Sequence, residues 1–351
     1  MKKKTIIISI AFILLIVMMV PLLSPLVIPK HDTARLTGEY YSQAGDNDVI
    51  FLGDCEVYET FIPAILWEKY GISSYVRGTP QQLIWQSYYI LEETLLQCEE
   101  KPKAVVFNVY SLKYGTPQSK ENNRYTLNTM KWSKTKIDAI RASMLDGESF
   151  IEYVIPFLGH HGRITSLTSR DFKYWFNTES LPIYSDSGYL MNVRINGTDK
   201  IVTEEDAGSL ATSESQFSEV SIDYLDKMYN LCKENDVELI LVKAPTNSFN
   251  VYWYEEYEEQ VEEYAETNGL KYYNLKECES DIGIDWSVDT HDKGFHLNVY
   301  GAEKATEYFG KILSEECDIP NRKDDPTIND KWNNRVKIYN ERKAKMEADE
   351  K

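Results

Sequence analysis

The chain has 351 residues, of which 42% are hydrophobic, enough for one large domain with an insertion or for two modest ones. Its formal net charge of −18 argues against nucleic acid as a partner and against broad adhesion to anionic lipid, because both need basic patches. Five cysteines lie at positions 55, 98, 232, 278 and 317, without the spacing typical of a metal site, and we expect no metal and no organic cofactor.

The N-terminus has the pattern of a membrane anchor. Three lysines, at positions 2 to 4, precede an uncharged run over residues 5–28. At about 1.5 Å per helical residue this run crosses a hydrocarbon layer of roughly 30 Å. Lysines on the near side predict a cytoplasmic N-terminus, with the remaining chain outside the cell membrane. A cleaved signal peptide is the alternative. We therefore assign residues 1–30 to a cytoplasmic stub and a single-pass anchor, and residues 31–47 to a linker.

The body of the chain alternates short apolar runs with helical patterns, which favours a parallel sheet covered by helices on both faces. The predicted fold class is α/β, a three-layer α/β/α sandwich over residues 48–317. Its expected strands are residues 48–53, 72–78, 103–112, 237–245 and 270–277, and its expected helices are residues 57–71, 83–97, 221–236, 253–267 and 298–313.

Local signals mark the helix ends and the irregular parts of the chain. Thr79-Pro80-Gln81-Gln82 matches a capping box at a helix start, and Asn298 is a plausible N-cap. Residues 113–215 break the alternation and form a mostly helical insertion. Residues 318–351 are a charged tail, in which a solvated helix over 331–348 is expected in preference to a docking element.

Three loops are expected to converge, because ligands of an open parallel sheet bind beyond the carboxyl ends of its strands. One is Gly53-Asp54-Cys55, another is Arg77-Gly78-Thr79, and the third follows residues 103–112. Cys55 opens a helix, where backbone N–H groups favour a thiolate and an oxyanion. Asp54 and Glu56 act in the opposite direction through their charge, so the sequence leaves the direction of the thiol pKa shift open.

A thiol acts as a nucleophile only if a base reaches it, and the candidate base is His296. It lies in a loop immediately before a helix, with Asp292 four positions earlier. A carboxylate beside an imidazole fixes its tautomer and stabilises the imidazolium. An ordinary loop histidine is the alternative reading.

Together these pieces resemble the SGNH/GDSL hydrolase family. The resemblance rests on Gly53-Asp54-Cys55, on Gly78, and on Asp292 with the phrase HLNVYGAEK, residues 296–304. It covers about residues 48–112 and 216–314 and fits best the membrane-anchored bacterial branch, which includes the D-alanyl transfer protein of teichoic acid modification and polysaccharide acetyltransferases. The implied fold is the flavodoxin-like SGNH sandwich.

The resemblance implies a role for each matching residue. Cys55 takes the place of the serine nucleophile, His296 that of the base, and Gly78 with the Cys55 amide that of the oxyanion hole. Asn108 is a stand-in for the asparagine of the family's third block. The family's acid stands three residues before the histidine, where this chain has Lys293, so Asp292 or Asp289 takes that role. Candidate substrate-binding residues are Asp54, Glu56, Arg77, His161 and Arg163, with a structural role as the alternative for the last two.

A thiolate attacks esters, and the resulting thioester hands its acyl group readily to a hydroxyl or amine acceptor. The resemblance therefore implies an extracytoplasmic esterase or acyltransferase acting on an envelope glycan or an acylated small molecule, with an acyl-export protein as a further implied partner. One alternative is a catalytically inactive relative that binds glycan or scaffolds an envelope assembly. Another is a different thiol enzyme, such as a thioesterase or peptidase.

Overall fold

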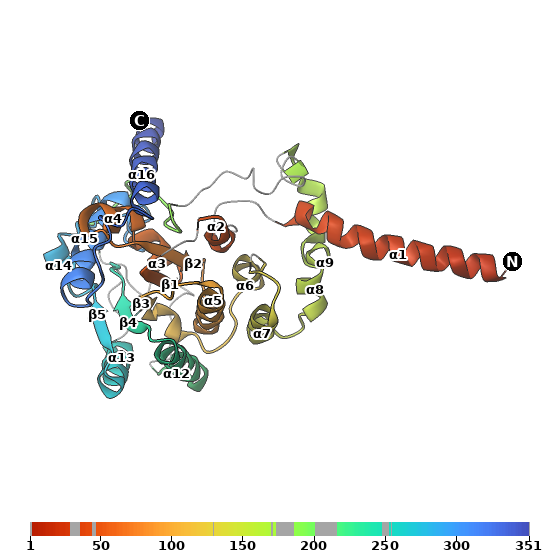
Figure 1. Cartoon of the computed structure of the whole chain (residues 1–351), viewed down its shortest axis with the longest axis horizontal. Coiled ribbons are helices and arrows are strands. Elements are labelled where there is room, and N and C mark those ends of the chain that lie inside the picture. The colour runs from red at the N-terminus through yellow and green to blue at the C-terminus, as the bar shows by residue number, and fades with distance from the viewer. Residues whose placement is uncertain are drawn as a thin grey trace.

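A computed structural model of the chain contains a five-stranded, all-parallel sheet with the strand order β2-β1-β3-β4-β5 (Figure 1). The structure describes residues 2–28, 36–43, 47–128, 130–169, 171–172, 186–200, 216–247, 253 and 255–350. The strands are β1 (Val49–Gly53), β2 (Ser74–Gly78), β3 (Ala104–Asn108), β4 (Glu238–Lys243) and β5 (Lys271–Asn274). All five lie within the strands predicted from the sequence.

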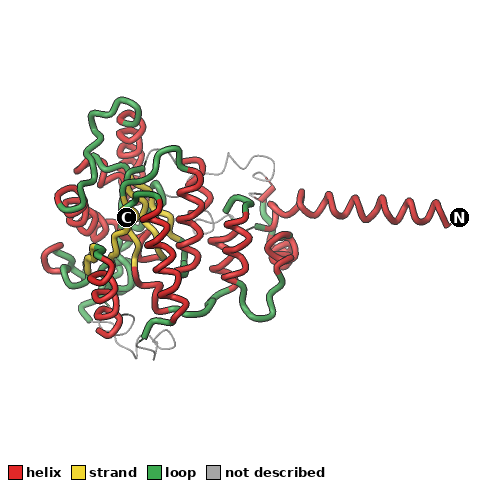
Figure 2. The backbone as a smooth tube through the Cα atoms, turned by 60° about the horizontal axis from the view of Figure 1, so that its bottom comes forward, coloured by secondary structure: helices red, strands yellow, loops and turns green. Residues whose placement is uncertain are grey.

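Helices flank the sheet and extend from it (Figure 2). The helices before β4 are α1 (Lys2–Val27), α2 (Leu36–Gln43), α3 (Cys55–Thr60), α4 (Pro63–Tyr70), α5 (Ile84–Gln97), η1 (Val109–Lys113), α6 (Lys120–Leu127), α7 (Lys134–Ser143), α8 (Phe150–Val154), α9 (Pro156–His160), η2 (His161–Ser166) and α12 (Glu219–Glu234). Those that follow are α13 (Glu255–Asn268), α14 (Glu279–Ile282), α15 (Val299–Glu315) and α16 (Asn329–Glu350).

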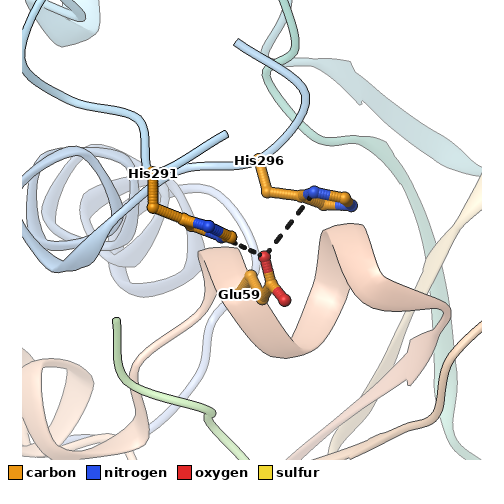
Figure 3. Close-up of side chains that lie close together, drawn as sticks. All are labelled: Glu59, His291 and His296. Carbon is orange, nitrogen blue, oxygen red and sulfur yellow. Dashed lines mark hydrogen bonds and ion pairs between the residues drawn. The ribbon is translucent and has the colours of Figure 1, made fainter. Parts of the chain in front are cut away.

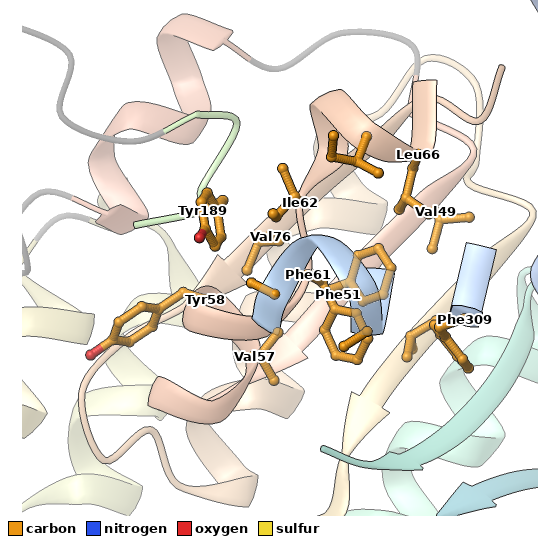
Figure 4. Close-up of a cluster of buried hydrophobic side chains, with 14 of the residues drawn as sticks. Val49, Phe51, Val57, Tyr58, Phe61, Ile62, Leu66, Val76, Tyr189 and Phe309 are labelled. Atoms are coloured by element: carbon orange, nitrogen blue, oxygen red, sulfur yellow. The ribbon is translucent and has the colours of Figure 1, made fainter. Parts of the chain in front are cut away.

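Successive strand residues point to opposite faces, and both faces of this sheet are apolar. Phe51 and Val106 face a core built with α3, α4 and α15, in which Phe51 stacks on Phe61 with ring centroids 4.6 Å apart (Figure 4). Ile50 and Phe107 face the second core, built with α5, α12 and α13. Each fully buried side chain of this kind contributes roughly 1.5–3 kcal/mol. The sheet is therefore held between two hydrophobic layers.

Two predicted helices near the sheet begin or end at other residues. The helix expected over 57–71 is divided into α3 and α4, because Pro63 has no backbone N–H and starts a new helix. The predicted capping box at Thr79 does not start α5, which begins at Ile84. Thr79 to Gln82 instead form a turn in which Gln81 has a φ of 49°. Asn298 is the N-cap of α15 as predicted, and accepts hydrogen bonds from the backbone of Tyr300 and Gly301.

The charged tail is part of the folded domain, which corrects the expectation of a solvated helix. Helix α16 packs along α4, and Trp332 stacks on Trp67 with ring centroids 5.6 Å apart. Trp332 and Tyr339 are both buried. The remaining surface of α16 is rich in charged residues, so the composition of the tail does not predict this apolar contact.

Helix α1 projects away from the domain, and its segment from Lys4 to Ser24 has a mean hydropathy of 3.1 over its most apolar window (Figures 1 and 2). By length and composition it is long and apolar enough to cross a membrane. The insertion is helical from α6 to η2, whereas residues 186–200 form an extended segment against the domain. Residues 173–185 and 201–215 of the predicted insertion lie outside the described residues.

Candidate functional site

The first half of the site is the turn between β1 and α3. Gly53 has a φ of 152°, and a Cβ there would lie 2.4 Å from a methyl carbon of Val57, so only glycine fits. Asp54 is the N-cap of α3, and its side chain accepts a hydrogen bond from the Glu56 amide. Cys55 is thereby placed at the first residue of the helix, half-buried at the carboxyl edge of the sheet.

The second half is the loop before α15. Asp292 Oδ1 accepts a hydrogen bond from the backbone N–H of His296 at 2.8 Å, and Asp292 Oδ2 lies 2.6 Å from Nδ1 of the same histidine. Lys293 and Gly294, with φ values of 66° and 95°, turn the chain between them. This turn brings the Asp292 carboxylate back to His296, four positions later, where it orients the imidazole.

The two halves meet. The Cys55 thiol and the His296 ring lie close enough to each other that each shifts the pKa of the other. Because Nδ1 faces Asp292, the nitrogen left for the thiol is Nε2. Both residues line a cavity of about 280 Å³, whose wall consists of Asp54, Cys55, Glu56, Gln81, Tyr110, Tyr114, Thr246, Asp292, Phe295 and His296. The aromatic rings and the convergent polar groups are typical of a small-ligand pocket.

Glu59 and His291 extend this arrangement (Figure 3). Glu59 lies four residues after Cys55, on the same side of α3. Its carboxylate contacts Nε2 of His291 at 2.8 Å and lies 3.7 Å from Nδ1 of His296. The two imidazole rings are nearly parallel, with centroids 6.0 Å apart. His296 is therefore flanked by two carboxylates, those of Glu59 and Asp292.

The electrostatics of the pair favour a neutral thiol in the resting protein. Burial, followed by the charge of Asp54, raises the pKa of Cys55 to about 11, although His296 acts in the opposite direction. Burial lowers the pKa of His296, but Glu59, Cys55 and Asp292 outweigh it and place this pKa well above its ordinary value. Burial and the neighbouring Glu56 also raise the pKa of Asp54, to about 7. A thiol in this environment would have to lose its proton before it could act as a nucleophile.

Gly78 lies beside the turn that carries Cys55, in register with Gly53. A Cβ at Gly78 would lie 3.1 Å from the carbonyl oxygen of Asp54, so a side chain there would press on this turn. Gln81, which follows Gly78 in the same loop, reaches the cavity wall. The Gly78 backbone thus lies directly beside the turn that carries Cys55.

Asn108 and Glu56 support the turn at Asp54 and Cys55 through buried hydrogen bonds. The Asn108 amide donates to Glu56 at 2.9 Å and to Asp54 at 3.5 Å, and its oxygen accepts from the Ala244 amide. Both of its amide hydrogens are engaged, which contradicts the expectation that Asn108 serves an oxyanion. Glu56 forms a buried ion pair with Lys243 at 2.9 Å. Glu56 reaches the cavity wall, but its carboxylate is held by Lys243 and Asn108.

Three other predicted positions lie away from the cavity. Arg77 is fully buried, pairs with Glu93 at 2.9 Å and faces the opposite core, because alternate strand residues face opposite sides. Arg163 donates to the Val27 carbonyl and pairs with Asp171. Asp289 pairs with Lys304 at 2.6 Å, which leaves Asp292 as the acid that contacts His296. The side chain of His161 lies outside the described residues.

A set of nitrogen and oxygen atoms suited to a divalent metal is present at the same place. Single ligand atoms of Glu59, His291 and His296 lie within 4.8 Å of one another. They are already engaged with one another and with Asp292. A metal bound through Nδ1 of His296 would displace Asp292 from that nitrogen. Metal binding and orientation of the base by Asp292 therefore exclude each other.

A larger cavity, about 600 Å³, lies at the opposite edge of the sheet, near Asp48, Lys103 and Asp236. These residues precede β1, β3 and β4, so this cavity is at the amino ends of the strands. Parallel α/β sheets bind ligands at the carboxyl ends, where Cys55 and His296 lie. We therefore assign the function to the smaller cavity.

Four residues of the site are not among those predicted from the sequence: Glu59, His291, Tyr110 and Tyr114. Glu59 could have been predicted from the sequence, because a residue four positions after a cysteine that opens a helix lies on the same helix face. Tyr110 and Tyr114 follow the end of β3 and enter the cavity wall through η1. Because both residues follow the carboxyl end of a strand, their position in the sequence also indicated that they lie near the site.

Residues 194–318 match the model of an uncharacterised protein family. The match includes β4, β5, Asp292 and His296, and does not include Cys55. A search of curated proteins finds no match to the chain.

Proposed function

We propose that this chain is an SGNH/GDSL-like acyl esterase or acyltransferase, anchored by α1 and acting outside the cell membrane on envelope polysaccharide. The observation that carries the proposal is that Cys55 and His296 lie side by side in one cavity, while Asp292 holds Nδ1 of the histidine. A nucleophile, a base and an orienting acid in series are the arrangement that acyl transfer requires.

In the proposed reaction, Cys55 Sγ attacks the carbonyl carbon of an acyl ester while Nε2 of His296 takes the thiol proton. The backbone amides of Cys55 and Gly78 stabilise the oxyanion of the tetrahedral intermediate. The intermediate collapses, the C–O bond breaks, and His296 returns the proton to the leaving alkoxide. A thioester remains on Cys55. An acceptor hydroxyl, or water, then attacks the thioester with His296 as base, and the thiol is regenerated.

The cavity supports a small acyl group such as acetyl. Its volume of about 280 Å³ is below that of typical drug-sized pockets, and Tyr110, Tyr114 and Phe295 supply apolar wall around the thiol. Aromatic faces in this position also suit stacking against a sugar ring. No step requires a metal or an organic cofactor.

The test is turnover of an acetyl ester by the wild type, Cys55→Ala, Cys55→Ser and His296→Ala. We expect Cys55→Ala and His296→Ala to fall to the background rate, with near-ultraviolet circular dichroism confirming that each variant is folded. Equal rates for all four proteins would contradict the proposal. That result would favour a non-catalytic glycan-binding protein, a role that the raised pKa of Cys55 also permits.

A further inference from the structure

The outer end of α1 is covered by the insertion. Residues in the first half of α1, such as Ile8, are exposed, whereas Ser24, Leu26 and Val27 are buried. Helix α9 and η2 pack against α1, and Arg163 of η2 donates a hydrogen bond to the Val27 carbonyl at 3.0 Å. If α1 spans a bilayer, as proposed above, this contact lies at the level of one membrane surface.

Helix α9, together with α8 that packs on it, lies across the end of α1 and does not continue its axis (Figure 1). A helix crossing the end of a membrane span lies along the surface of the bilayer. This is the orientation of interfacial helices, which bury an apolar face at the boundary between headgroups and acyl chains. The placement of α8 and α9 is thus that of elements resting on the membrane.

Their side chains divide into two sets. Toward the domain, Tyr153 is buried and Glu152 pairs with Arg124 at 2.6 Å. Other side chains of the same segment are large, apolar and exposed. These are Ile151, Val154, Leu158, Ile164 and Phe172, with 40–49% of each accessible. A soluble surface rarely exposes so many large apolar side chains within a short segment, and such a patch marks an interaction site.

We infer that this surface, defined by Ile151, Val154, Leu158, Ile164 and Phe172, rests in the lipid interface of the membrane that α1 crosses. The inference rests on the proposed membrane span and not on the proposed acyl transfer. The occupant is lipid because α9 and η2, which carry Leu158 and Ile164, pack directly against the end of α1. The chain's net charge of −18 disfavours attraction to anionic headgroups, so the contact is apolar.

This second attachment fixes how the domain is oriented. A domain held by one helix and a linker is free to rotate above the bilayer, whereas a domain held at α1 and along α8 to η2 is not. The cavity at Cys55 then keeps a constant height and direction relative to the membrane. An acyl donor bound in the bilayer would always meet the cavity from the same side.

The experiment uses the full chain in liposomes of zwitterionic lipid, with nitroxide labels at three introduced cysteines. The variants are Leu158→Cys on the proposed surface, Val220→Cys on exposed α12, and Ile8→Cys within α1. The chain without an introduced cysteine, treated with the same label, gives the background signal from the native cysteines. Power-saturation electron paramagnetic resonance then compares accessibility to dissolved oxygen, which partitions into lipid, and to a water-soluble nickel chelate.

We expect the labels at positions 8 and 158 to be accessible to oxygen and several-fold less accessible to the nickel chelate than the label at position 220. Replacing a third of the lipid by an anionic one should leave this difference unchanged. A label at 158 that matches the one at 220, with position 8 in lipid, overturns the inference and keeps the anchor. Aqueous labels at both 8 and 158 overturn the anchor as well. Protection of position 158 from both reagents would overturn the inference in favour of a protein partner.

Discussion

The Glu59 carboxylate lies 3.7 Å from Nδ1 of His296, although the two residues are 237 positions apart in the chain. This proximity favours protonation of the proposed base. A carboxylate this close to Nδ1 favours the imidazolium, which cannot accept the proton of Cys55. The carboxylate of Glu59 therefore limits the proposed reaction at low pH.

The rate is expected to rise with pH. The pKa of His296 is raised, so the ring stays protonated and inactive as a base until pH exceeds this raised value. Glu59→Gln removes a negative charge, lowers the pKa of His296, and should shift the rise of kcat/KM to lower pH. The measurement is the pH profile of acetyl ester turnover. Glu68→Gln, at an exposed position on α4, is the control and should keep the wild-type profile.

The orienting acid is tested by comparing two aspartates. Asp292→Asn leaves His296 Nδ1 without its carboxylate and should lower kcat by about 10²–10⁴-fold while the protein stays folded. Asp289→Asn breaks the contact with Lys304 and should cost about 1–3 kcal/mol of the free energy of unfolding with little loss of kcat. Urea denaturation and turnover, measured on both variants, separate the two effects. Similar kcat values in the two variants would contradict the assignment of Asp292.

The thiol is expected to react slowly at neutral pH. Because the pKa of Cys55 is about 11, iodoacetamide labelling of its peptide, followed by mass spectrometry, should accelerate steadily between pH 8 and pH 11. His296→Ala removes the group that lowers this pKa and should slow the labelling further. A site that depends on a general base also tolerates a hydroxyl, so Cys55→Ser should retain measurable turnover. Fast labelling at pH 7 would contradict the protonation state described here.

Arg77 is expected to matter for stability alone. Arg77→Met leaves Glu93 buried and unpaired and should cost about 3–5 kcal/mol of the free energy of unfolding. The double variant Arg77→Met/Glu93→Gln removes the stranded charge and should recover part of that loss. Turnover per folded molecule should be unchanged in the double variant. A selective rise of KM in the double variant would instead restore Arg77 as a substrate-binding residue.

Substitution of Trp332 tests whether the C-terminal tail packs on the domain. Trp332→Ala empties the site against Trp67 and should cost about 3–5 kcal/mol, as judged by thermal or urea denaturation. Ile338→Ala, at an exposed position of α16, should change stability by less than about 0.5 kcal/mol. Equal effects of the two substitutions would support a tail that is not part of the core.

The sequence by itself determined the strands, the α/β class, the apolar N-terminal helix, and the two loops that carry Cys55 and His296. These features follow from local patterns: apolar runs of strand length, a glycine at the end of a strand, and a span without charge. Only the tertiary structure decided that Asp292 and not Asp289 contacts His296, that Glu59 and His291 join the site, that Arg77 faces the opposite core, and that α16 packs on α4. The reason is that each of these depends on which face of a strand or helix meets a segment distant in the chain, and a linear pattern of residue types does not specify that partner.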